Sequence, residues 1–277
     1  MWNTGTGLNK YNDTANIVIM VSSTKYFNVP IPLLKGVLTG EKEIGDFTQE
    51  VVRYSLYRHA KHLPYSDDPN AVEPNKISTQ IKAAASFLNV NIGNIDRSIS
   101  EGRDLFSQHG DKGTFCGINA TILWDYNDNP KTERQIAQLC AFCATKSIIG
   151  KAAYKRTNKK LIVARMFGYS TFADFEKDAP ALTARNISKE ARTIREVAAE
   201  RRRKYCDRYH IDKILTDLEC DWGLKRYADH IRGMYISYES DLATLAQVCE
   251  DSKRSVKVDA LKEAKRQAKL AAQSTTP

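Results

Sequence analysis

Apolar residues recur at steps of three and four positions along most of the chain, and this spacing predicts a mainly α-helical protein. The first predicted helix covers 46–62, where Phe47, Val51 and Leu56 share one face and no proline interrupts the segment. A short strand is predicted before it at 17–21, because the run IVIMV is rich in β-branched residues. The beginning of the chain is therefore expected to be helical with one short strand.

The segment 78–102 predicts two helices joined by a tight turn. A serine and a threonine at its start can cap the first helix, Asn89 tolerates the left-handed turn conformation, and a second apolar face begins at Val90. The small residue Ala85, followed by a turn residue four positions later, resembles the generic helix-turn-helix of DNA-binding proteins.

This resemblance implies that the second helix reads base edges in the major groove. Asparagine and arginine suit that role, because they form paired hydrogen bonds with adenine and guanine respectively. The residues it would present are Asn91, Gly93, Asn94, Arg97 and Ser98. An ordinary helical hairpin produces the same pattern, and it stays open as the alternative.

The segment 107–131 has apolar residues in partial alternation, which fits a strand or a buried helix. As a strand it would be a wing beside the helix pair. The next segment, 132–150, predicts a buried helix that starts at Thr132 and ends at Gly150. A second and weaker helix-turn-helix resemblance follows at 157–178.

The rest of the chain, from 183 to 273, is almost entirely helical in pattern and predicts a bundle. With the proline-rich stretch 64–74 as a loop or linker, three segments are expected. These are 1–76, helical with a short strand; 77–182, a basic helix-turn-helix or winged-helix-like nucleic-acid-binding region; and 183–277, a helical bundle with a frayed basic tail.

Positive charge is concentrated in the middle of the chain. The net charge is +9, and residues 131–204 hold 18 basic and 7 acidic side chains. Such asymmetry is typical of a surface that faces a polyanion, because phosphate contacts supply most non-specific affinity. The cations expected on phosphates are Lys146, Lys151, Lys155, Arg156, Lys159, Lys160 and Arg165. Arg201, Arg202 and Arg203 either extend this surface or form the solvated face of a long helix.

Metal and catalytic motifs are weak by comparison. Cys140 and Cys143 form one CxxC inside an apolar helical pattern, whereas zinc sites usually show two such pairs in loops. Asp217, Glu219 and Asp221 lie close together, but residues two apart on a helix point away from each other. We therefore expect no metal, no cofactor and no enzymatic activity, with a metal-dependent nuclease as one alternative.

The longest aliphatic run, 17–21, is far shorter than the roughly 20 residues that span a bilayer. Six irregularly spaced cysteines do not suggest a disulfide framework, so a cytoplasmic protein without membrane contact is expected. The sequence thus predicts a non-enzymatic DNA-binding protein, such as a transcription regulator or a replication-initiation or organising factor of a phage or mobile element. RNA as the ligand, a homodimer, and an adaptor role with an acidic protein partner remain open.

Overall fold

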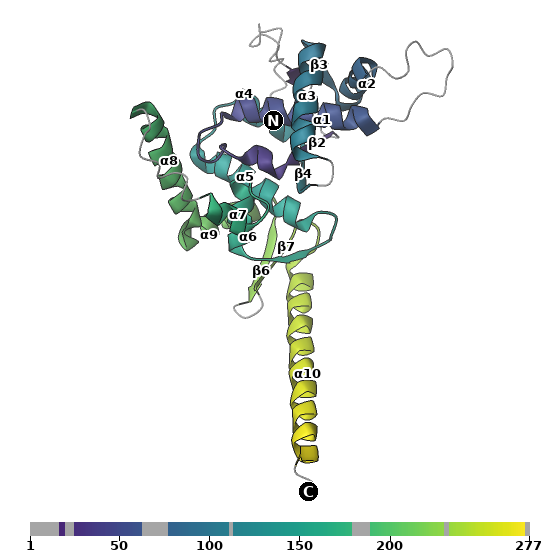
Figure 1. Ribbon diagram of the computed structural model, residues 1–277, viewed down its shortest axis with the longest axis vertical. Coiled ribbons are helices and arrows are strands. Elements are labelled where there is room, and N and C mark those ends of the chain that lie inside the picture. The colour runs from purple at the N-terminus through teal and green to yellow at the C-terminus, as the bar shows by residue number, and fades with distance from the viewer. Residues whose placement is uncertain are drawn as a thin grey trace, which may run out of the picture.

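The computed structural model describes residues 17–19, 25–62, 77–110, 113–178, 189–229 and 233–274 (Figure 1). Within them the protein is mostly helical with a few short strands, as the spacing of apolar residues predicts. The proline-rich stretch 64–74 and the basic residues His230 and Arg232 lie outside the described residues. Among the described residues, no helix has the length and apolar character needed to cross a membrane.

Three helices pack together in the N-terminal part of the molecule. They are α1 (Ile44–His62), α2 (Ile77–Leu88) and α3 (Ile95–His109). The predicted helix at 46–62 is confirmed as α1, which lies against both α2 and α3. Close approach of α1 and α3 requires Gly102, because a Cβ atom there would lie 2.8 Å from the carbonyl oxygen of Arg53.

Two antiparallel strand pairs accompany these helices. Strand β1 (Ile17–Ile19) pairs with β3 (Val90–Ile92), and β2 (Tyr26–Pro30) pairs with β4 (Phe115–Asn119). A short 3₁₀ helix, η1 (Ile31–Leu34), follows β2 directly. The first pair confirms the predicted strand near 17–21 over the part of it that is described.

The ambiguous segment 107–131 contains both a strand and a helix. Strand β4 is followed at once by α4 (Ala120–Asp128), whose first turn is capped by the side chain of Asn119. Strand β4 pairs with β2, and a wing beside α2 and α3 is not confirmed.

The predicted helix pair at 78–102 needs correction. Asn89 adopts the left-handed conformation that the sequence suggests, with φ of 59°. The residues after it, Val90–Ile92, form strand β3 instead of the start of a helix, and α3 begins only at Ile95. The alternating β-branched residues of this strand pair with β1, which accounts for the difference.

Helix α5 (Glu133–Ile149) lies at the centre of the molecule and contacts α6, α9 and β4. Its start and end are confirmed. Thr132 and Gln135 form a reciprocal capping box, and Gly150 ends the helix with φ of 61°. Buried side chains surround nearly the whole helix, so its apolar residues form no narrow stripe.

Two short helices follow α5 after strand β5 (Lys155–Thr157). They are α6 (Lys159–Met166), capped by Asn158, and α7 (Phe172–Lys177), capped by Thr171. Gly168 ends α6 with φ of 85°, and a Cβ atom there would lie 2.6 Å from the backbone nitrogen of Lys35. This close contact places α6 against the segment around η1.

The C-terminal part is not a helical bundle, contrary to the sequence-based prediction. Helices α8 (Lys189–Cys206) and α9 (Arg208–Asp221) are followed by a hairpin of β6 (Lys225–Asp229) and β7 (Gly233–Ser237). This hairpin joins β5 in an antiparallel sheet with the strand order β5-β7-β6. Strand β7 is in the middle of that sheet.

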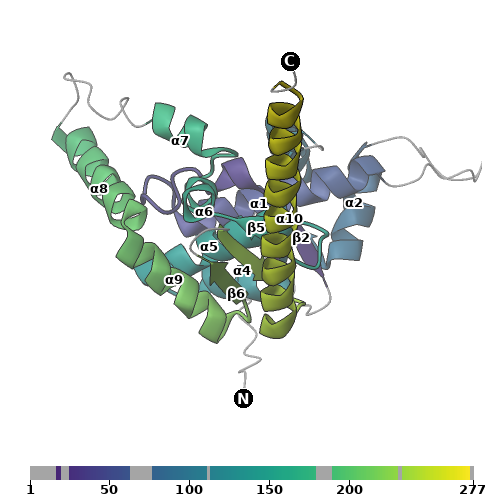
Figure 2. The same ribbon diagram turned by 90° about the horizontal axis from the view of Figure 1, so that it is seen from below.

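The last helix, α10 (Leu242–Ser274), projects from the body (Figures 1 and 2). Its first turns pack against the sheet, where Leu245 and Cys249 form a small apolar cluster with Tyr235. Side chains 260–267 are all exposed. A helix of 33 residues is about 50 Å long, so much of α10 lies away from the body.

Candidate nucleic-acid interface

The residues predicted to read bases lie at the start of α3, and several of them serve the helix itself. Asn94 accepts a hydrogen bond from the backbone nitrogen of Arg97 at 3.0 Å. Ser98 is buried and donates to the backbone oxygen of Asn94 at 2.8 Å. Asn91 and Gly93 are exposed, in β3 and in the bend after it. Ser98 is therefore inaccessible to a groove, and the side chain of Asn94 caps α3.

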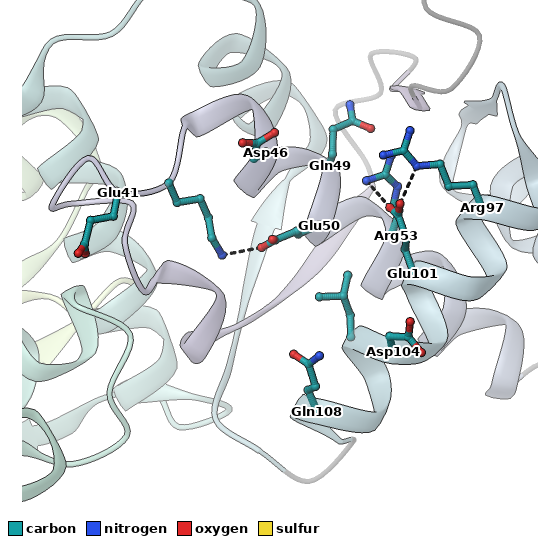
Figure 3. Close-up of a pocket in the computed structure, with 11 residues that line it drawn as sticks. Glu41, Asp46, Gln49, Glu50, Arg53, Arg97, Glu101, Asp104 and Gln108 are labelled. Carbon is teal, nitrogen blue, oxygen red and sulfur yellow. Dashed lines mark hydrogen bonds and ion pairs between the residues drawn. The ribbon is translucent and has the colours of Figure 1, made fainter. Parts of the chain in front are cut away.

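Arg97 instead faces an acidic groove of about 490 Å³ between α1 and α3 (Figure 3). Its Nε lies 2.6 Å from Glu101 Oε1, and Arg53 Nη1 lies 2.7 Å from Glu101 Oε2. The five carboxylates that line the groove are Glu41, Asp46, Glu50, Glu101 and Asp104. Three cations, Lys42, Arg53 and Arg97, line it with them. Since carboxylates are in excess, this groove does not favour phosphate.

The central cations fall into two groups, and the first is exposed. Lys151 follows α5, Lys155 and Arg156 lie on edge strand β5, and Lys160 is in the first turn of α6. Lys160 Nζ lies 5.1 Å from the centroid of the Phe172 ring. No carboxylate among the described residues forms an ion pair with any of these four cations. They are available to an external anion.

The second group makes contacts inside the protein, although the charge of Lys146 is not neutralised by its ring contact. Lys159 Nζ donates to Asp212 Oδ2 at 2.7 Å, and Lys146 Nζ lies 4.4 Å from the centroid of the Tyr238 ring. Arg165 is half-buried, and its Nη1 donates to Ser147 Oγ at 3.0 Å. Burial also lowers the pKa of Arg165. The structure places Arg165 inside the fold rather than on a phosphate-facing surface.

The arginine run on α8 divides in the same way. Arg201 Nε lies 3.4 Å from Glu133 Oε2, and the Arg202 guanidinium lies 3.8 Å from the centroid of the Phe175 ring. Arg202 also donates to the backbone oxygen of Phe175. Arg203 is exposed. Two of the three arginines therefore attach α8 to the body, and Arg203 remains at the surface.

A second cleft, of about 680 Å³, lies between the start of α6, helix α9 and the hairpin. Asp212 of α9 lies 3.3 Å from Arg226 Nη1 and 3.9 Å from Arg208 Nε, in addition to its contact with Lys159. Arg226 Nε also donates to Glu219 Oε1 at 2.7 Å. Asp212 and Glu219 of α9 are thus paired with cations from α6, from β6 and from α9 itself.

The run 217–221, considered above as a metal site, is organised by ion pairs. Asp217 is nearly buried and accepts two hydrogen bonds from Arg134, one from Nε at 2.7 Å and a second from Nη2. The hydrogen bond from Arg134 is the main reason that the pKa of Asp217 is lowered. Within the described residues, no group of three or more histidine, cysteine or acidic side chains is arranged to hold a metal ion.

Cys140 and Cys143 are both buried in α5. Burial raises the pKa of Cys140 to about 12 and contributes to raising that of Cys143, whose largest cause is a hydrogen bond with Cys116. A thiol with such a pKa stays protonated at neutral pH, which disfavours both metal ligation and nucleophilic chemistry. The CxxC spacing here reflects packing.

Sequence reasoning missed the β6–β7 hairpin and its basic residues Lys225 and Arg226. It also missed the cleft beside β2 and β4, in which Lys146 and Lys151 lie. Comparison with known proteins gives no relatives: no protein-family model, no curated protein and no solved structure matches this chain.

Proposed function

We propose that this protein binds duplex DNA through a winged-helix-like unit, as a regulator of transcription or a factor in replication. The unit consists of α5, β5, α6, α9 and the β6–β7 hairpin, with α7 and α8 inserted between its second and third helices. Its sheet has the order β5-β7-β6, and helix, strand, two helices and a hairpin in this order are typical of winged helices. In that arrangement α9 is the reading helix and the hairpin is the wing.

The exposed face of α9 has the chemistry that base reading needs. Ile211, Leu215 and Leu218 are buried on one side of the helix. Arg208, Lys213 and Thr216 are exposed, and Tyr209 is 69% exposed. Arginine and lysine bond to guanine, and threonine bonds to several base edges. We therefore propose α9, instead of α3, as the helix that reads bases.

The observation that carries the proposal is the set of exposed cations beside the hairpin that have no ion-pair partner among the described residues. Lys155 and Arg156 lie on β5, which pairs directly with β7. A Cβ atom at Gly233, the first residue of β7, would lie 3.5 Å from Arg156 Nε. Lys155 and Arg156 therefore lie on the strand next to the wing, on opposite faces of the sheet, where phosphate contacts could set the register of the duplex.

The test is fluorescence-anisotropy binding of a labelled random duplex across a salt titration. Each phosphate contact contributes about 0.9 to the slope of log K against log salt concentration. Changing Lys155, Arg156 and Lys160 together to alanine should lower that slope by roughly 2 to 3. The matched control changes three exposed cations of the N-terminal helices, Lys61, Lys82 and Arg103, to alanine.

The control variant removes the same charge and should keep the wild-type slope. Equal losses in both variants would show that net charge alone governs binding, and the proposed surface would be wrong. If the wild-type protein does not bind duplex at low salt, the same cations are better explained by an acidic protein partner.

A further inference from the structure

The outer face of the β2–β4 pair forms the floor of a cleft of about 880 Å³. Cys116 and Ile118 of β4 are buried toward the core, so the alternate residues of the strand face outward. Gly117 lies directly across from Asn28 in the register of the pair, and Tyr26 is two residues from Asn28 on the same face. Strand alternation thus brings a tyrosine, an amide and a bare backbone to one surface.

The wall of the cleft is the C-terminal end of α5. Phe142 and Lys146 of that helix line it, followed by Lys151 just beyond the helix. None of the described residues that line the cleft is acidic, whereas the groove in Figure 3 is lined by five carboxylates. Of these two surfaces, the cleft beside β4 is the one that favours an anion.

The floor of the cleft leaves room for a flat ring. Tyr26 is 61% exposed although its neighbours Phe27 and Val29 are fully buried. A Cβ atom at Gly117 would have no other atom within 4 Å, so the space above this residue is open. An exposed aromatic ring beside open backbone is the arrangement on which single-stranded nucleic acids stack their bases.

We propose that this cleft binds one unpaired nucleotide, with its base against Tyr26 and its phosphate near Lys146 and Lys151. The inference rests on the proposed function in that the ligand is again a nucleic acid, but it concerns a different surface and an unpaired strand. The nucleotide could belong to a single strand or be free in solution, and the two sources share the chemistry that the cleft recognises.

Two variants test the site, and neither should disturb the fold. Gly117→Val fills the cleft: the position has no steric neighbour, its φ is not in the left-handed region, and valine suits a strand. Tyr26→Ala removes the exposed ring. The matched control is Leu261→Ala, which removes an apolar side chain on α10 that is as exposed as Tyr26, 61% in both cases. Thermal unfolding followed by circular dichroism checks that all three proteins are folded.

The measurement is anisotropy of a labelled 15-nucleotide oligothymidylate at low salt. Gly117→Val and Tyr26→Ala should each weaken its affinity by about fivefold or more, about 1 kcal/mol, the low end of what one stacked base contributes. Leu261→Ala should keep the affinity of the wild-type protein. Both cleft variants should retain wild-type affinity for duplex, which separates this inference from the proposed function.

Thymidine monophosphate, added as a competitor at millimolar concentration, identifies the source of the nucleotide. Displacement of the oligonucleotide would indicate a site for a free nucleotide, and no displacement would indicate a site for a strand. The proposal is overturned if the wild-type protein does not bind oligothymidylate, or if Gly117→Val binds it as tightly as the wild-type protein does.

Discussion

At the scale of single residues, the charged side chains fall into two groups: those with an ion-pair partner, and those without one among the described residues. Arg134 of α5 binds Asp217 of α9 through two hydrogen bonds, and Arg226 of the hairpin binds Glu219. The first pair joins helices that are far apart in the sequence, and the second joins α9 to the strand that follows it. Cations on β5 have no such partner among the described residues, which is why we place the ligand surface there.

The Arg134–Asp217 pair makes stability depend on pH. The folded-state pKa of Asp217 lies below its ordinary value because Arg134 donates to the carboxylate. The stabilisation is therefore fully present above the unfolded-state pKa and is lost as pH falls through the folded-state pKa. We expect Asp217→Asn to lower the urea midpoint at pH 7 and to differ less from the wild-type protein near pH 3. An equal difference at both pH values would contradict this role.

At the scale of elements, helices that lie on the core with one apolar face could be predicted from the sequence. Helix α1 has that spacing, and α5 and α6 have recognisable residues at their ends, such as Thr132 and Gly150. Strand β7 could not be predicted, because four of its five residues are buried and show no alternation. Met234 and Ile236 face the main core while Tyr235 faces α10.

The candidate site could likewise be predicted only in part. The segment that carries the charge could be predicted, since composition alone reveals it. Which cations remain available could not, because Arg201 meets Glu133 and Lys159 meets Asp212 only in the folded chain. For 78–102, the alternative of an ordinary helical hairpin is closer to the structure than the prediction of a reading helix. Strand β3 interrupts that hairpin.

Helix α10 should contribute to stability only through its first turns. A chain that ends at Ser252 keeps Leu245 and Cys249 in their cluster and loses residues beyond it, of which 260–267 are exposed. We expect its free energy of unfolding to lie within about 0.5 kcal/mol of the full chain. Leu245→Ala removes a fully buried side chain and should cost about 2 kcal/mol or more. Urea unfolding of both variants measures this, and a large loss on truncation would show that distal α10 packs elsewhere.

At the scale of the whole molecule, one continuous apolar core runs from Phe27 of β2 to Ile236 of β7. Helix α5 lies within this core and contacts β4 as well as α6 and α9. We therefore expect the body to unfold in one cooperative transition. Far-UV circular dichroism, which reports on the helices, should coincide with tryptophan fluorescence, which senses Trp124 and Trp222 beside the core. Two separated transitions would mean that the halves fold independently.

The length of α10 also sets the distance between the sheet and the far end of the helix. From Cys249, the last residue of the cluster with Tyr235, to Ser274 the helix rises roughly 35 to 40 Å at 1.5 Å per residue. One turn of duplex DNA measures about 34 Å. A protein or label joined at Ser274 would therefore stand about one duplex turn away from the sheet.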